Sequence, residues 1–197
     1  MQPTIEFKLD EDRSRDALVY LATKLEELPS ATGLDIYRAC KLLFLADKLH
    51  LVRYGRTITG DRYFALDHGP APNRILSLLQ LFLEDENLPW LSSVLTVDHT
   101  YKHPRFRPKR PPEFESLSES DIEALDETIA RHGSKTFAEL KALTHEMVAY
   151  QNAWGKRGER GSAAMNFEDF FDEDSDAIAG VLEEAIEDAL LAKALLR

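Results

Sequence analysis

The sequence predicts a mainly α fold of the α+β class, a compact helical domain with short antiparallel β-hairpins. Several segments carry apolar residues at the spacing of a helix face, the most continuous lying between residues 34 and 51. Short alternating segments bounded by Gly, Pro or Asp lie between them, as in hairpins. A hydrophobic content of 44% supports a core, and a length of 197 residues favours one domain.

The first helix is expected to run to about Leu28, with Asp10 or Asp12 as its N-cap. Its apolar stripe has helical spacing and comprises Ala17, Leu18, Leu21, Leu25 and Leu28. Residues 1–12 are expected to be extended. Alternating apolar residues in this leader predict a short strand, at Ile5, Phe7 and Leu9.

The second helix is expected to start at residues 32–35 and to continue to about Val52, with Gly55 ending it. It is apolar nearly all round, and a helix without a polar face normally lies at the centre of a fold. We therefore expect four of its side chains to be buried: Leu42, Leu45, Ala46 and Leu49.

Two short strands are expected next, Arg56–Ile58 and Arg62–Leu66, with Thr59–Asp61 as their turn. Gly69 and Pro70 are expected to end the second strand. A third helix should follow, with one apolar side made by Ile75, Leu78, Leu79 and Phe82.

The later elements begin with a hairpin between Val94 and Phe106, confined to a sheet edge by the prolines that follow. Ser118 is the expected N-cap of a fourth helix. The expected order is then a helix over 122–132, a helix over 137–154, a glycine-rich loop over 155–162 and a helix over 176–196. We expect one helical domain over 1–160, with an acidic segment and amphipathic helix over 161–197 packed on it.

The net charge of −11 and a pI near 5.0 argue against general nucleic-acid binding, which depends on Lys and Arg. Lys102–Arg110 is the one concentrated basic segment; it is either a contact for nucleic acid or an acidic partner, or a solvated arm.

A single cysteine, Cys40, excludes an internal disulfide and favours a reducing compartment. With no signal peptide and no membrane span in the sequence, we expect a cytoplasmic protein.

Candidate chemistry centres on Asp47 and His50, three apart on one helix face. Together with Asp61 and His68 they are possible zinc or manganese ligands, which gives the hypothesis of a metal-dependent hydrolase. The spacing matches no strong metal motif, however, and buried polar groups are usually held by hydrogen bonds. We therefore expect a structural network and predict no catalytic residue, cofactor or metal.

A longer ordered pattern runs through the same region: Lys41-Leu42-Leu43, Ala46-Asp47-Lys48, His50-Leu51, Tyr54-Gly55-Arg56, Ile58–Asp61, Tyr63 and His68-Gly69-Pro70. This series resembles the core of the Panacea domain of SocA-like bacterial antitoxins and related phage proteins. A weaker likeness follows at Leu143–Glu146 and Ala153-Trp154.

The resemblance implies a non-enzymatic antitoxin whose partner is a cognate protein toxin, expected to be encoded next door. It also implies a possible adaptor role that delivers the toxin to a ClpXP-type protease. The alternatives are the hydrolase above and a prophage-derived nucleic-acid-binding regulator. Within the resembling region, Tyr54, Arg56, Asp61 and His68 become candidates for partner contact. A second set, Asp47, His50, His145 and Trp154, is assigned to a structural network.

The acidic segment after residue 161 suggests a second contact surface. Phe170 and Phe171 lie among acidic residues and are candidate apolar anchors for a basic partner, with Glu168, Asp169 and the acids at 172–174 around them. The alternative is a capping segment whose acidic side faces water and whose Phe side chains are pinned to the domain.

Overall fold

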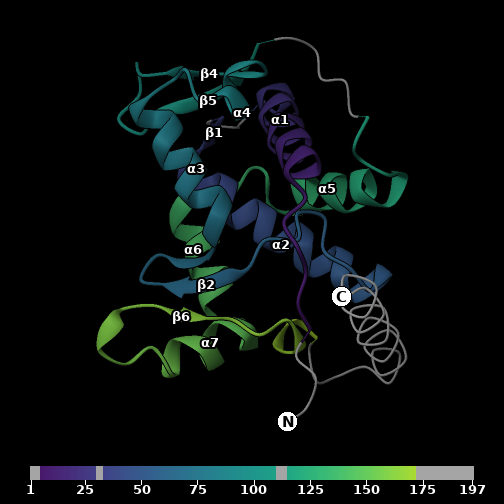
Figure 1. Cartoon of the computed structure of the whole chain (residues 1–197), viewed down its shortest axis with the longest axis vertical. Coiled ribbons are helices and arrows are strands. Elements are labelled where there is room, and N and C mark those ends of the chain that lie inside the picture. Colours follow the sequence, from purple (N-terminus) through teal and green to yellow (C-terminus); the bar gives the residue numbers. More distant parts are fainter. Residues whose placement is uncertain (1–4, 30–32, 110–114, 172–197) are drawn as a thin grey trace.

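Helix α2, Ile36–Tyr54, crosses the middle of the computed structural model, and the other elements pack around it (Figure 1). The structure describes residues 5–29, 33–109 and 115–171. Asp35 caps the start of α2 by accepting a hydrogen bond from the Arg38 N–H, and Gly55 ends it at a left-handed φ of 72°. Three of the four side chains expected to be buried are buried, while Leu49 is half-buried. The prediction of a central second helix is therefore confirmed.

The other helices keep their order along the chain. They are α1 (Glu11–Glu27), α3 (Asn73–Glu84), α4 (Pro89–Ser92), α5 (Glu119–His132), α6 (Phe137–His145) and α7 (Val148–Gly155), with 3-10 helices at Gly158–Arg160 (η1) and Phe167–Phe170 (η2). Asp10 caps α1 and Ser118 caps α5, as their sequences predict.

Two small antiparallel sheets flank α2 (Figure 1). One has the order β1 (Leu34–Asp35), β5 (Arg105–Pro108), β4 (Leu95–Asp98); the other has the order β3 (Gly69–Pro72), β2 (Tyr63–Leu66), β6 (Ala163–Ala164). The β4–β5 hairpin lies where one was predicted, but β5 is the central strand of its sheet and not an edge strand. The prolines allow this because only Arg105 and Phe106 pair with β1. Helices with small antiparallel sheets confirm the mainly α, α+β class.

Of the two strands predicted after α2, the second is confirmed as β2, whereas Arg56–Ile58 forms no strand and the hairpin lies further along the chain. Residues 57–61 form a loop, and the hairpin is β2–β3, turned at Asp67 and His68. The reason is that Ile58 and Thr59 donate their N–H groups to the Asp47 carboxylate, which leaves these donors unavailable to a strand ladder. Gly69 was expected to end the second predicted strand, but it begins strand β3.

The leader over residues 5–10 is extended, but the predicted strand there is wrong, because this segment joins no sheet. It lies on the loop after α2, where the Asp10 N–H donates to the Thr59 carbonyl at 2.9 Å. Gly60 makes this close approach possible: its φ is 69°, and a Cβ there would lie 2.1 Å from the Lys8 carbonyl oxygen. At the start of the leader, the Ile5 N–H donates to Glu168 Oε1 at 2.7 Å.

The single helix predicted over 137–154 is two helices, α6 and α7, separated at Glu146 and Met147. Met147 has a ψ of 137°, which is extended backbone. The break allows Tyr150 to stack on His145, with ring centroids 4.3 Å apart. It also brings the Tyr150 hydroxyl to the Leu66 carbonyl, to which it donates at 2.9 Å. The break between the two helices is thus accompanied by the packing of Tyr150 against His145 and by its hydrogen bond to β2.

The end of the described chain packs into the core. Ala163 and Ala164 pair with β2, and Phe170 contacts the rings of Phe44 and Tyr63. The helix predicted over 176–196 lies outside the described residues, and the boundary at residue 160 stays a prediction. In the part of the chain that the structure describes, no helix combines the length and apolarity that a bilayer span requires.

Candidate partner-binding site

Asp47 organises the loop that follows its own helix. Its buried carboxylate accepts four hydrogen bonds: from the N–H groups of Ile58 (2.7 Å) and Thr59 (3.0 Å), and from the hydroxyls of Thr59 (2.5 Å) and Tyr63 (2.8 Å). Burial raises the pKa of Asp47 to about 6, and these hydrogen bonds oppose the shift. Because these donors occupy both carboxylate oxygens, Asp47 has a structural role: it holds the backbone of Ile58 and Thr59 and the side chain of Tyr63 in place.

His50 lies in a different polar group, between α2 and α5. Its Nδ1–H donates to the Arg56 carbonyl at 2.7 Å, which leaves Nε2 as the acceptor for the Ser120 hydroxyl at 3.0 Å. Burial lowers the pKa of His50, so the ring is neutral near pH 7. Arg56 Nη1 lies 2.9 Å from Asp121 Oδ1 and forms an ion pair with it. The group joins the end of α2 to the start of α5.

Asp61, a candidate for partner contact, is buried and serves as a cap for α3. Its carboxylate accepts hydrogen bonds from the N–H groups of Arg62 (2.8 Å), Arg74 (3.2 Å) and Ile75 (2.8 Å). These last two donors belong to the first turn of α3, whose N–H groups have no partner within the helix. Asp61 therefore has a structural role in this conformation.

The four residues of the hydrolase hypothesis are not brought together as a metal site. Asp47 and Asp61 bind separate sets of backbone donors, His50 bonds through both nitrogens, and His68 is exposed. Over residues 5–29, 33–109 and 115–171, no cluster of three or more His, Cys, Asp or Glu side chains could hold a metal ion. The described geometry supplies no ligand set for that hypothesis.

His68 sits on the β2–β3 turn in an aromatic cluster centred on Tyr37. The Tyr37 ring centroid lies 5.1 Å from that of Phe137, 5.7 Å from that of His103 and 5.9 Å from that of His68. Lys141 Nζ lies 3.5 Å from His68 Nδ1. We call these five residues the turn face. They come from α2, the β2–β3 turn, the β4–β5 loop and α6, so no local motif could have shown the cluster.

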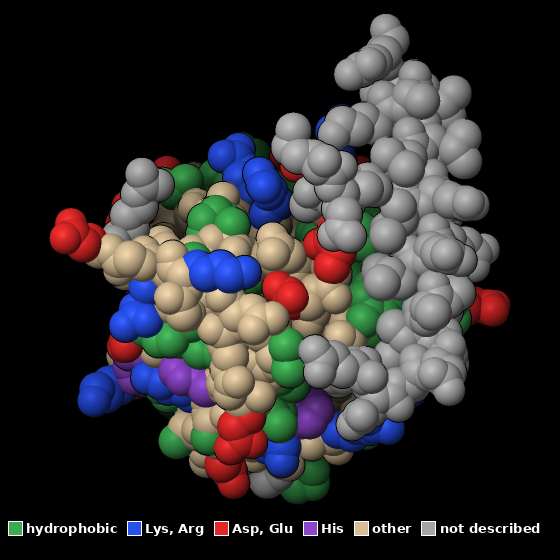
Figure 2. All heavy atoms as spheres, turned by 90° about the horizontal axis from the view of Figure 1, so that it is seen from below, with side chains coloured by type: hydrophobic (Ala, Val, Ile, Leu, Met, Phe, Trp, Pro, Cys, Tyr) green, Lys and Arg blue, Asp and Glu red, His purple; other side chains and the backbone are tan. Residues whose placement is uncertain are grey.

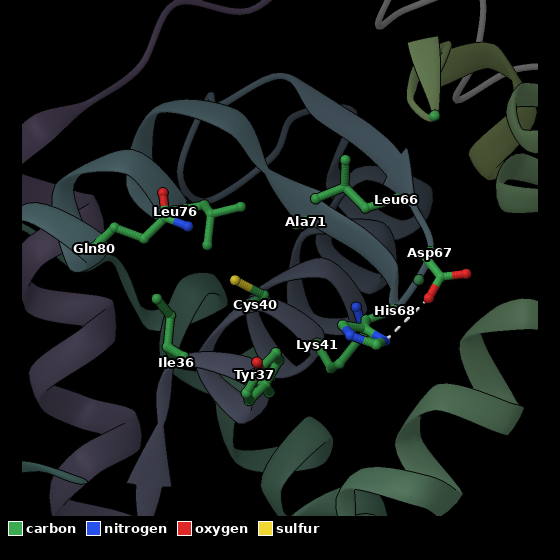
Figure 3. Close-up of a pocket in the computed structure, with 12 residues that line it drawn as sticks. Ile36, Tyr37, Cys40, Lys41, Leu66, Asp67, His68, Ala71, Leu76 and Gln80 are labelled. Carbon is green, nitrogen blue, oxygen red and sulfur yellow. Dashed lines mark ion pairs between the residues drawn. The ribbon is translucent and has the colours of Figure 1, made fainter. Parts of the chain in front are cut away.

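A cavity of about 420 Å³ opens beside the turn face. Its walls are mostly apolar, and they include Ile36, Leu66, Ala71 and Leu76. Figure 3 shows Lys41, Asp67 and His68 gathered at one end of the cavity, with Ile36, Leu76 and Gln80 at the other. Cys40 also lines it, but burial raises the pKa of its thiol to about 12, so the sulfur is a neutral wall atom and not a nucleophile.

Tyr54 and Arg56 lie at the far end of α2 from this cavity. The helical rise separates Tyr37 from Tyr54 by about 25 Å. Tyr54 is 41% exposed and donates its hydroxyl to Glu123 at 2.8 Å, while Arg56 is half-buried against Asp121. The candidate contact residues therefore fall at two separate places, and only His68 belongs to the turn face.

His145 and Trp154 belong to an aromatic stack instead of the Asp47 group. Tyr150 lies between them, 4.3 Å from His145 and 5.7 Å from Trp154, and the Arg157 guanidinium lies 4.0 Å from the centroid of the Trp154 ring. The structural network assigned to Asp47, His50, His145 and Trp154 is thus three separate groups.

Phe170 and Phe171 are core residues here, contrary to the expectation that they anchor a partner. Phe170 is 0% exposed and Phe171 7% exposed. Their acidic neighbours also have internal roles, because Glu168 binds the Ile5 N–H and Asp169 accepts from Asn152 at 3.0 Å. The acids at 172–174 lie outside the described residues. The alternative that the Phe side chains are pinned to the domain fits this packing.

The basic stretch 102–110 is partly used inside the protein. Arg107 pairs with Glu26 and Asp98, at 2.7 and 2.8 Å, and Lys109 Nζ donates to the Ser92 carbonyl at 2.6 Å. The Arg105 guanidinium stacks 3.2 Å from the centroid of Tyr101. Arg110 lies outside the described residues. Lys102 and His103 are exposed, and His103 belongs to the turn face.

A family model described as "Antitoxin SocA-like, Panacea domain" matches residues 40–154, more than half of the 197-residue chain. No curated protein and no solved structure matches the chain. The matched segment includes α2 from Cys40, the β2–β3 hairpin and both α6 and α7, which together supply most of the cavity wall and most of the turn face. This chain belongs to the SocA-like antitoxin family and carries its Panacea domain.

Proposed function

We propose that the protein neutralises a cognate protein toxin in the cytoplasm by direct contact, and that the turn face and its cavity form the contact surface. Family membership supports an antitoxin role. The observation that carries the choice of surface is the partly exposed Tyr37-centred cluster at the mouth of the cavity. Aromatic residues are enriched in protein interfaces and often contribute most of the binding energy.

The charge of this surface indicates the partner. Lys141 places a cation on the turn face, beside the imidazole ring of His68, in a chain whose net charge is −11. Figure 2 shows Lys, Arg and His side chains adjoining one another on part of the molecular surface. A toxin that docks here should present acidic residues around an apolar patch, because complementary charge speeds encounter and fixes orientation. This reverses the charge expected from the acidic segment after residue 161.

Co-expression tests this surface. The candidate toxin is the product of the reading frame adjacent to this gene, and the readout is rescue of growth together with pull-down. Placing negative charge on the turn face with His68→Glu and Lys141→Glu should weaken capture of the toxin at least about tenfold. Arg62→Glu, an exposed reversal on another part of the surface, and Tyr54→Ala, at the far end of α2, are matched controls that should retain capture. If Tyr54→Ala lost capture of the toxin while the turn-face variants retained it, the contact site would lie at the Tyr54 end of α2 instead.

The mode of neutralisation is a further part of the proposal. Blocking requires only a stable complex, whereas delivery to a ClpXP-type protease requires that the toxin disappear. The half-life of the toxin in cells with and without that protease separates the two. A long half-life in both strains, with growth rescued, supports blocking; a half-life shortened only where the protease is present supports delivery.

A further inference from the structure

Lys41 is an unusual buried group. The residue is 2% exposed, and its ammonium donates one hydrogen bond, to the Pro70 carbonyl at 2.6 Å. An ammonium has three N–H donors. Among the described residues, no carboxylate pairs with Lys41 and no second acceptor is within hydrogen-bond range. Burial lowers the pKa of Lys41 to about 8, so the group is still mostly charged near pH 7. A buried charge without a counter-ion costs several kcal/mol.

The position of Lys41 suggests what the charge is for. Lys41 lines the cavity of about 420 Å³, a volume in the range of small-ligand sites. The one carboxylate in the wall, among the described residues, is Asp67, whose side chain is 78% exposed and lies 3.5 Å from His68 at the rim. The rest of the wall is largely apolar, so the cavity offers one cation at the end of an apolar chamber.

We infer that this cavity binds a carboxylate attached to an apolar body, with Lys41 as its counter-ion. The apolar walls would receive the body, and the free N–H donors of the ammonium would receive the oxygens. A single amine matches a single negative charge. A phosphate would be poorly neutralised, because no arginine of the described chain lines the cavity to supply the paired donors that phosphate prefers.

Lys141 strengthens this assignment. It lies near His68 at the cavity mouth, and its charge is one of the influences that lower the pKa of Lys41. Two cations close together repel each other, and an anion between or beside them relieves that repulsion. The carboxylate has two chemical sources, a free small acid or the end of a polypeptide. The inference does not depend on the toxin, because it concerns the purified chain alone.

The test is calorimetric titration of the full chain with matched probes. The acids are hexanoate, octanoate and 4-phenylbutanoate, and the controls are the corresponding neutral amides. Each acid that binds should have a dissociation constant at least about tenfold lower than that of its amide, because one charge-assisted hydrogen bond contributes about that much to affinity. Lys41→Met should remove this preference while filling the same space. Lys156→Met, the same change at an exposed lysine that does not line the cavity, should keep it.

Two peptides distinguish the source of the carboxylate: Gly-Ser-Gly-Phe-Leu with a free C-terminus, and the same peptide amidated. Tighter binding of the free peptide than of any small acid assigns the site to a polypeptide end, and the reverse order assigns it to a small molecule. If no acid and no peptide binds at 10 mM, roughly the weakest useful limit, or if acids and amides bind alike, the inference is wrong. In wild-type protein, the ¹³Cε resonance of Lys41 should move on binding, which gives a readout even if the variant does not fold.

Discussion

His50 Nε2 lies 3.2 Å from Asp121 Oδ1, and both side chains are completely buried where α2 packs on α5. Asp121 also faces Arg56 Nη1 at 2.9 Å and Arg13 Nε at 3.6 Å. Its second oxygen accepts hydrogen bonds from the Ser118 N–H and hydroxyl, which closes the capping box of α5. Through Arg13 and Arg56, one carboxylate thus links α5 to α1 and to the residues that directly follow α2.

Removing the Asp121 carboxylate should lower the stability of the protein strongly. Asp121→Ala leaves Arg56 without its buried partner and opens the capping box, so we expect a loss of about 3–5 kcal/mol in the free energy of unfolding. Glu139→Ala is the matched control, because Glu139 occupies the same position in the capping box of α6 but is exposed. Urea denaturation should show a large shift for the first variant and a small one for the second. Equal shifts would show that Asp121 acts only as a cap.

Asp47 should matter through the donors that it satisfies. Asp47→Ala leaves four buried donors on Ile58, Thr59 and Tyr63 without an acceptor, and we expect a loss of about 3–5 kcal/mol. Asp47→Asn keeps one acceptor oxygen and should lie between the alanine variant and the wild type. Thermal melting of the three proteins gives the order. A melting temperature of Asp47→Ala equal to that of the wild type would rule out the role assigned to this carboxylate.

Gly69 leaves room for Lys41. Its φ is 96°, and a Cβ there would lie 3.0 Å from Lys41 Cε, Lys41 Nζ and Thr144 Oγ1. Gly69→Ala should therefore destabilise the protein by about 1–3 kcal/mol. Gly155→Ala is the matched control, since a Cβ at that position would have no neighbouring atom within 4 Å and Gly155 ends helix α7. It should be neutral or stabilising by up to about 1 kcal/mol. Equal stability of both variants in urea would contradict the crowding at Gly69.

Lys41→Met should stabilise the protein although it removes a charged residue from the proposed site. The folded pKa of Lys41 is about 8, below the unfolded value of 10.5. Between these values the unfolded chain holds a proton that the folded protein has released, so the wild type gains stability relative to the variant as pH rises. The advantage of the variant should be about 1–3 kcal/mol at pH 7 and should disappear by pH 10.5. Urea denaturation across this range measures the difference between the two proteins, in which the other titrating groups cancel. A difference that does not change with pH would contradict the shift.

Phe170→Ala should lower stability and leave partner contact unchanged. The ring packs 5.3 Å from Phe44, 5.2 Å from Phe167 and 5.9 Å from Tyr63, and its loss should cost about 3–5 kcal/mol. Capture of the toxin at low temperature, normalised to the folded fraction, should equal that of the wild type. Weak capture with an unchanged melting temperature would restore Phe170 as a contact residue.

The helices α1, α2, α3 and α5 were predictable because their signals are local, whereas the split between α6 and α7 and the short helix α4 were not predicted. Asp10, Asp35 and Ser118 are caps that the backbone uses directly, and Gly55 takes the left-handed conformation that ends α2. The first hairpin was misplaced because its position depends on the Asp47 carboxylate of the preceding helix, not on the strand pattern. A local signal for the true turn did exist, in His68-Gly69 between two short apolar segments.

The site could be predicted only in part. His68 lies on the turn face, but Tyr37, His103, Phe137 and Lys141 were missed, since four separate segments bring the face together. Phe170 and Phe171 were expected to be exposed because their acidic neighbours indicated an exposed segment, whereas both side chains are buried. Lys41 was noticed within the family pattern, but its burial beside a cavity is a property of the folded chain.

The contact between Ile5 and Glu168 bears on how this chain is made. A ribosome adds residues in order, and the leader, α1 and α2 emerge long before strand β6 and the Phe170 side chain that covers Phe44 and Tyr63. During synthesis the core of the growing chain is therefore incomplete: the Phe170 ring does not yet cover Phe44 and Tyr63, and the Ile5 N–H has no Glu168 carboxylate to bind. Translation must pass residue 171 before the described core closes. A chain that stops before Phe170 would lack its ring and would leave Phe44 and Tyr63 without this cover.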